Sequence, residues 1–305
     1  MAFGPITDAQ RVGYQENVTL ALQQKRSRYR DYFTFQPNLK GRVALAIEIF
    51  GSEEAIIDGA RGGDTPAIEG SLEDTWMKPR QLEWGKLVEK EDQVKNMTDY
   101  TSTYVQTGAA AIARGEDSIL RQSFFGPRLI GQDGTSSEAL ALTADFNLVP
   151  VGYVANGAAV NSGITIEKLN YAITLLAANE VDMERDIIAM AIGAKQENQL
   201  YNLLQYTSKD YRDKAVLDTE RQRVASFGPI TFVRDQKLPT NGTAKQRRCP
   251  LWVKSGMHYA EFDPLTTQMD RNPQKKFRVQ AYMEEWFGAT RGENGKVIYI
   301  DCLEP

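Results

Sequence analysis

Apolar residues recur at helical spacing in the first long periodic stretch of the chain, residues 102–125. Its apolar positions are Val105, Ala109, Ile112, Ile119, Leu120 and Phe124, and this spacing predicts an amphipathic α-helix. Gly108 and Gly115 lie inside the stretch, and each costs a helix about 1 kcal/mol relative to alanine. We therefore expect tertiary packing to hold this helix, or a bend at the glycines.

A second periodic region follows, in which predicted helices and strands alternate. Residues 165–180 indicate an amphipathic helix with Thr165 as its N-cap. Its expected buried stripe is Ile166, Leu169, Ile173 and Leu176. Residues 186–192 are typical of a buried strand, 195–206 of a helix and 228–233 of a strand. This order predicts a compact α/β subdomain.

Two extended runs in the first third of the chain predict a long β-hairpin. Residues 42–50 are apolar and rich in β-branched side chains. In residues 75–88, the apolar residues Trp76, Leu82, Trp84 and Val88 are all at even positions and would lie on one face of a strand. Charged residues interrupt this alternation. The segment 59–71 is dense in glycine and turn residues, which suits a hairpin tip. Since a two-stranded arm is marginal alone, it needs a partner surface.

The remaining patterns are shorter. Residues 126–163 are rich in Gly, Asn and Ala, and predict loops with short strands. Residues 250–302 contain three β-type runs separated by turn signals, and these strands are expected to close the fold.

Near the N-terminus, residues 15–30 predict a short amphipathic helix that ends in a basic stretch. The cations are Lys25, Arg26, Arg28 and Arg30. They can meet an acidic neighbour or nucleic acid, or form a solvated charged end, and the sequence leaves both open. With a formal net charge of −4 and a pI near 5.4, any contact with DNA is expected to be weak and local.

Composition places the chain among globular proteins, with 305 residues, 42% of them hydrophobic and 25% charged. No stretch reaches the roughly 18 apolar residues of a membrane helix, and the first residues lack the apolar core of a secretory signal. We therefore expect no membrane partner and a cytoplasmic site of synthesis and assembly. Cys249 and Cys302 are expected to be buried thiols.

Candidate catalytic chemistry is sparse, because His258 is the only histidine. No nucleophile-elbow sequence accompanies it, and two distant cysteines give no zinc-site spacing. The glycine clusters at Gly59 and Gly292 match neither a phosphate loop nor a dinucleotide fingerprint, so we interpret both as turns. The expectation is a protein without catalytic, metal or cofactor-binding residues.

Several motifs resemble one known family in order and spacing. The most specific are RRCPLWVKSG at 247–256, TTQMDRNPQKK at 266–276, QAY at 280–282, GATR at 288–291 and KVIYIDC at 296–302. LQQKRSR at 22–28, DTP at 64–66 and YVQTGAAAIAR at 104–114 add to them. Together they resemble the major capsid proteins of tailed bacteriophages with the Hong Kong 97-type fold, in a short form without a fused scaffolding domain.

The resemblance implies an α+β architecture with four parts. They are an N-terminal arm (1–37), an extended β-hairpin loop (38–90), a peripheral domain with a long spine helix (91–127 and 245–305) and an α/β axial domain (128–244). It also implies self-assembly into pentamers and hexamers of an icosahedral head that encloses double-stranded DNA. The implied partners are other copies of the chain, a scaffolding protein, a portal and a cement or decoration protein, and the implied location is the virion.

Candidate inter-subunit contacts follow from this picture. Arg61 and Asp64 at the hairpin tip, Trp76 and Trp84 in the hairpin, and Arg26 and Arg28 in the arm are the residue types that anchor interfaces or meet opposite charge. Packing within the chain is the competing interpretation for the two tryptophans. Competing functions are a nanocompartment shell of the same fold, a hydrolase and a shell-decorating protein.

Overall fold

The computed structural model describes residues 26–51, 72–88, 101–203, 217–218, 223–224, 226–241, 245–275 and 278–304. The α-helices are α3 (Thr101–Phe125), α4 (Ile166–Ala178) and α5 (Ala194–Tyr201). The 3₁₀ turns are η1 (Arg30–Tyr32), η3 (Lys254–Gly256), η4 (Pro273–Lys275) and η5 (Asn294–Lys296).

The other described elements are β-strands. They are β1 (Thr34–Phe35), β2 (Ala44–Phe50), β3 (Leu72–Met77), β4 (Arg80–Val88), β5 (Arg128–Ile130), β6 (Ser136–Glu138), β7 (Leu148–Val149), β8 (Ile188–Ile192), β9 (Leu217–Asp218), β10 (Arg223–Val224), β11 (Ser226–Phe227), β12 (Ile230–Arg234), β13 (Thr240–Asn241), β14 (Gln246–Val253), β15 (Met257–Asn272), β16 (Arg278–Arg291) and β17 (Val297–Leu303).

The chain divides into two compact units. The first contains Met1–Ser27, Pro79–Ile119 and Glu261–Gly288, and the second contains Arg28–Lys78, Leu120–Ala260 and Ala289–Pro305. The elements α3, β15 and β16 contribute residues to both.

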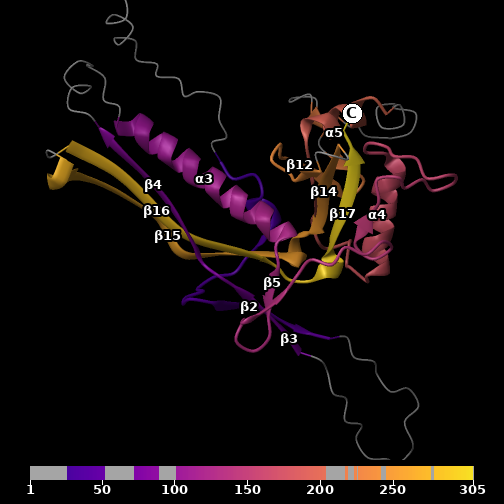
Figure 1. Cartoon of the computed structure of the whole chain (residues 1–305), viewed down its shortest axis with the longest axis horizontal. Helices are drawn as coiled ribbons and strands as arrows, with labels where there is room; N and C mark the ends of the chain where they lie inside the picture. The colour runs from indigo at the N-terminus through magenta and orange to yellow at the C-terminus, as the bar shows by residue number, and fades with distance from the viewer. Residues whose placement is uncertain are drawn as a thin grey trace, which may run out of the picture. The chain divides into compact units, whose positions relative to one another are not determined.

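In the first unit, α3 lies along β4 and β16 (Figure 1). These strands are antiparallel, with Met283 opposite Trp84. A Cβ on Gly108 would lie 2.6 Å from the Met283 Sδ and 2.7 Å from the Trp84 ring, and one on Gly115 would lie 2.9 Å from a Leu82 methyl. The two glycines thus let the predicted helix approach the sheet closely, and this packing offsets their low helix propensity.

The hairpin of the second unit is formed by β2 and β3, with a register shift between Leu45 and Ile47. The expected second run, 75–88, is divided. β3 ends at Met77 and pairs with β2 and β5, whereas β4 starts at Arg80 and pairs with β16. Pro79 explains the division, because proline has no N–H for a sheet ladder and restricts the residue before it.

The main sheet of the second unit has the order β11-β12-β8-β14-β17-β7, with β13 paired to β14. β8 is parallel to β12 and antiparallel to β14, and β14 is antiparallel to β17. All five residues of β8 and the last five of β14 are buried. The C-terminal strands β14 and β17 therefore lie inside the sheet with β8. The apolar run from Cys249 to Val253 in β14 fits such a position, since interior strands are covered on both faces.

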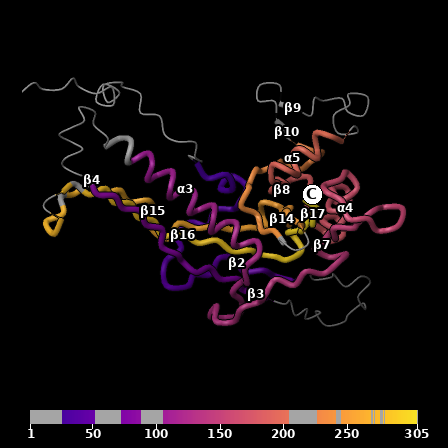
Figure 2. Tube along the Cα trace, turned by 45° about the horizontal axis from the view of Figure 1, so that its top comes forward, coloured from indigo at the N-terminus to yellow at the C-terminus, as the bar shows by residue number. Residues whose placement is uncertain are grey.

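Helix α4 packs on this sheet beside β17 and β7 (Figure 2). The Thr165 side chain accepts a hydrogen bond from the Lys168 amide, which confirms the predicted N-cap. Leu169 and Leu176 are buried as expected, whereas Ile166 and Ile173 are only half-buried. The buried face is completed by Lys168, Ala172 and Leu175.

An aromatic cluster ties the start of the described chain to the second unit. Its members are Tyr29, Phe33, Phe124 and Trp252, and each is at most 1% exposed. The Phe124 and Trp252 ring centroids are 4.6 Å apart, and the Trp252 indole donates a hydrogen bond to the Tyr32 carbonyl at 2.9 Å. Residues 28–36 therefore belong to the second unit. Of the predicted helix at 15–30, residues 15–25 lie outside the described residues.

Candidate assembly elements

The far end of the described hairpin presents two apolar side chains to solvent. Phe50 on β2 is directly opposite Leu72 on β3. Phe50 is 73% exposed and Leu72 is 55% exposed. Paired apolar residues at the end of a two-stranded hairpin expose area that association with another surface can bury.

The predicted tip residues, Arg61 and Asp64, lie outside the described residues. The two tryptophans make contacts within their own units. The Trp76 indole donates a hydrogen bond to the Gly131 carbonyl, and its Cγ would be 2.6 Å from a Cβ on Gly134, whose φ is +61°. Trp84 packs over Gly108. The competing interpretation, packing within the chain, thus accounts for contacts of both tryptophans.

The predicted arm cations lie at the start of the described chain. Arg26 and Arg28 are both exposed. The Arg28 guanidinium donates a hydrogen bond of 2.7 Å to the carbonyl of Arg234. Arg28 therefore attaches to the end of β12 and still presents charge to solvent.

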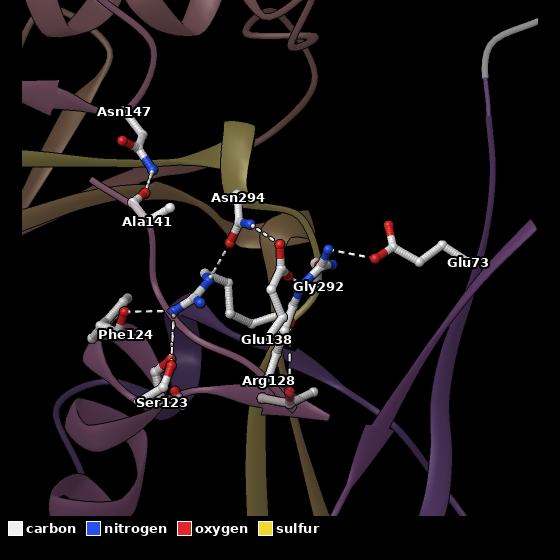
Figure 3. Close-up of polar contacts among 12 residues, drawn as sticks. Glu73, Ser123, Phe124, Arg128, Glu138, Ala141, Asn147, Gly292 and Asn294 are labelled. Atoms are coloured by element: carbon white, nitrogen blue, oxygen red, sulfur yellow. Dashed lines mark hydrogen bonds and ion pairs between the residues drawn. The ribbon is translucent and has the colours of Figure 1, made fainter. Parts of the chain in front are cut away.

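The base of the hairpin is organised around Arg128, the first residue of β5, which is 6% exposed (Figure 3). Its Nε donates to Glu138 on β6, and its Nη2 donates to Glu73 on β3. Its Nη1 donates to the Gly292 carbonyl at 2.5 Å. One guanidinium thus binds three segments of the second unit with three different nitrogens.

A second buried arginine continues this network. Arg291 is 1% exposed, and its Nη1 donates to the carbonyl oxygens of Phe124 at 2.7 Å and Gly126 at 3.3 Å. The Tyr299 hydroxyl also donates to the Phe124 carbonyl. A cation and a hydroxyl therefore satisfy carbonyls at the C-terminus of α3, where the helix dipole favours positive charge.

The two arginines are joined through Asn294. Arg291 Nε donates to the Asn294 Oδ1 at 2.8 Å, and the Asn294 amide donates to Glu138 at 3.3 Å (Figure 3). Glu138 in turn accepts from Arg128. A continuous chain of polar contacts therefore joins the end of α3 to the hairpin strand β3.

Lys168 is a buried cation on α4 in the second unit. It is 0% exposed, and its Nζ donates to the carbonyls of Val151, Ser162, Gly163 and Asp301 at 2.8, 2.9, 3.0 and 3.1 Å. Burial lowers the pKa of its ammonium, while Cys302 and Asp301 act in the opposite direction. One side chain thus joins α4, the segment 151–163 and β17.

The candidates for catalytic or metal-binding chemistry, His258, Cys249 and Cys302, are all buried. His258 is 3% exposed, and its Nδ1 accepts from the Gln36 side-chain amide at 3.1 Å. Burial, with a contribution from Lys296, lowers the His258 pKa to about 4. Cys249 and Cys302 are buried free thiols, as predicted. Among the described residues, no group of His, Cys, Asp and Glu is placed to hold a metal ion. Within the same residues, no helix has the length and apolarity to cross a membrane.

Arg128, Arg291 and Lys168 are not among the site residues that the sequence predicts. A charged residue inside an otherwise apolar helical face was a usable signal for Lys168, next to Leu169. Arg291 lies in the GATR motif, whose pattern alone carries no structural role. No local pattern predicts Arg128 as a site residue, because two of its three partners, Glu73 and Gly292, are 55 and 164 residues away.

These features define a structural subunit with a mixed α+β fold and an exposed hairpin. The chain belongs to the phage capsid protein family, whose model matches residues 6–304. It is a shell subunit of a phage head and associates with other copies of itself. The family favours this assignment over a nanocompartment shell. No curated protein sequence matches the chain.

Solved structures agree on the fold. The chain is similar to "Mycobacterium phage Che8", with a TM-score of 0.65, 14% identity, and 94% and 95% of the two chains covered. It is similar to "Capsid structure of the Cyanophage P-SCSP1u", with a TM-score of 0.68, 15% identity, and coverage of 94% and 91%. It is also similar to "Cyanophage Pam1 capsid asymmetric unit", with a TM-score of 0.66, 14% identity, and 99% of each chain covered. The predicted Hong Kong 97-type fold is confirmed.

Proposed function

We propose that the chain forms pentamers and hexamers of an icosahedral head that encloses double-stranded DNA, and that its hairpin makes the contact between neighbouring subunits. The exposed pair Phe50 and Leu72 carries this proposal. A contact between a hairpin and a different surface of the next copy is heterologous, and such contacts close into rings when the rotation between copies permits.

Weak pairwise contacts suffice for such a shell. Each subunit in a lattice touches several others, so effective concentration stabilises the whole even when one contact is weak. Arg61, Asp64, Arg26 and Arg28 are further proposed contacts between subunits. Trp76 and Trp84 contribute by holding their strands in place, and their partly exposed rings extend the contact surface.

Other proposed partners are a scaffolding protein, a portal and a cement or decoration protein. Packaged DNA contacts the subunit weakly and locally, because the net charge of −4 repels a polyanion. Assembly takes place in the host cytoplasm. The proposed role is structural and includes no enzymatic step.

The double substitution Phe50→Ser and Leu72→Ser tests the hairpin contact. Since both side chains are exposed, the unfolding free energy is expected to change by less than about 0.5 kcal/mol. The yield of closed particles, measured by sedimentation and electron microscopy, is expected to fall at least about tenfold, because each particle repeats the contact many times.

Leu265→Ser on β15 is the matched control, since Leu265 is 44% exposed and belongs to the other unit. Its particles are expected to match the unmodified chain. Normal particle yield from the double variant would exclude the hairpin end as the contact.

A further inference from the structure

The outer hairpin receives little support from backbone pairing. β3 pairs with β5 only at Thr75 and Trp76. From Leu72 to Asp74, β3 has β2 as its sole described neighbour in the sheet. A two-stranded ribbon is marginally stable and twists readily, so something else must fix the direction of its outer part.

The Arg128–Glu73 ion pair acts beyond the last backbone pair. Glu73 lies two residues outside Thr75 on the same face of β3, because side chains alternate along a strand. Arg128 is almost fully buried, whereas the Glu73 side chain is 44% exposed. The contact therefore runs from a fixed donor inside the second unit to a carboxylate on the exposed hairpin.

The donor is fixed by its other partners. Glu138 is directly opposite Arg128 in the β5–β6 pair, and the Gly292 carbonyl binds a second nitrogen of the guanidinium. Glu138 is itself held by Asn294. Because the guanidinium is planar and rigid, these contacts fix the direction in which its remaining nitrogen points.

We propose that Arg128 is a positioning residue that sets the direction in which the β2–β3 hairpin leaves the subunit, and so determines how regular the shell is. This inference rests on the proposed function. Its physical basis is that Glu73 binds a donor whose orientation is set by β6 and the 292–294 turn. Removal of this link lets the outer hairpin sample more directions, of which a closed lattice accepts few.

The test uses Glu73→Ala in the full chain, with Glu48→Ala as the matched control. Glu48 is an exposed carboxylate on β2 of the same hairpin, opposite Asp74, and lies outside the Arg128 contacts. Hydrogen–deuterium exchange reports on the hairpin amides, and cryo-electron microscopy reports on particle diameter.

For Glu73→Ala, amides of residues 72–77 are expected to exchange about fivefold faster, as for loss of a partly exposed ion pair. Amides of β14 and β17 should keep their rates. The particles should vary in diameter or remain open. Glu73→Gln, which restores an acceptor without the charge, is expected to give an intermediate result. Arg128→Lys keeps the charge but has one nitrogen for three partners, and should match Glu73→Ala if it folds.

Equal exchange rates and equal particles for the Glu73→Ala and Glu48→Ala variants would overturn the inference. If the unmodified chain forms no particles, the proposed function fails. In that event the exchange rates of residues 72–77 alone decide whether Arg128 holds the hairpin.

Discussion

Lys168 shows how one buried charge can organise a subdomain. Its helix was predicted correctly, but the predicted buried stripe contained only apolar residues and did not include Lys168. The side chain turns inward because four backbone carbonyls in its surroundings accept from one ammonium. Such partners come from segments up to 133 residues away and cannot be found from local periodicity.

Lys168→Met is expected to lower the unfolding free energy by at least about 3 kcal/mol, because it removes four hydrogen bonds that a buried ammonium donates to backbone carbonyls. Urea unfolding followed by circular dichroism measures the change. Lys237→Met, at an exposed lysine, is the control and should change stability by less than about 0.5 kcal/mol. Equal stability of the two variants would show that the Lys168 contacts contribute little.

His258 gives a pH dependence with a defined sign. Its folded pKa of about 4 is below the ordinary value of 6.5, so the unfolded state binds more protons between these limits. The His258 contribution to stability is complete above pH 6.5 and is lost as pH falls toward 4. From pH 7 to pH 4.5 the loss is about 2 kcal/mol.

Comparison with His258→Asn isolates this contribution, because carboxylates titrate equally in both proteins. Urea unfolding at pH 7 and pH 4.5 should show a steeper loss for the unmodified chain. A parallel pH dependence of the two proteins would contradict a buried neutral histidine.

At the scale of elements, α3 was predicted to within one residue at its start, because its periodicity is long and regular. Its two glycines were recognised as a cost, but their purpose depends on Trp84, Leu82 and Met283, which come from other strands. The sequence predicted a hairpin here, but the predicted second strand continued past Pro79. The observed strand β3 ends at Met77, because proline has no N–H to donate to a neighbouring strand. The local sequence pattern therefore predicts the elements but not the residues of other strands that pack against them.

Gly108→Ala tests the close approach of α3. Helix propensity favours alanine by about 1 kcal/mol, but the new methyl group would meet the Trp84 ring. A net loss of about 1–2 kcal/mol is expected from overpacking. Gly115→Ala is the matched variant and should be closer to neutral, since a Leu82 methyl can rotate away. Stabilisation by Gly108→Ala in thermal unfolding would show that the contact is loose.

For the molecule as a whole, the family motifs between residues 247 and 302 predict the capsid fold from the sequence. They did not indicate how those residues divide, because β14 and β17 join the main sheet while much of β15 and β16 belongs to the other unit. Assembly contacts are harder still to predict, since their partner is another copy.

Negative-stain electron microscopy of the purified chain shows directly whether it assembles into a phage head. We expect closed, hollow shells of uniform diameter, and at least about tenfold fewer of them from the Phe50→Ser and Leu72→Ser double variant. Monomers or irregular aggregates from the unmodified chain would contradict self-assembly into a phage head.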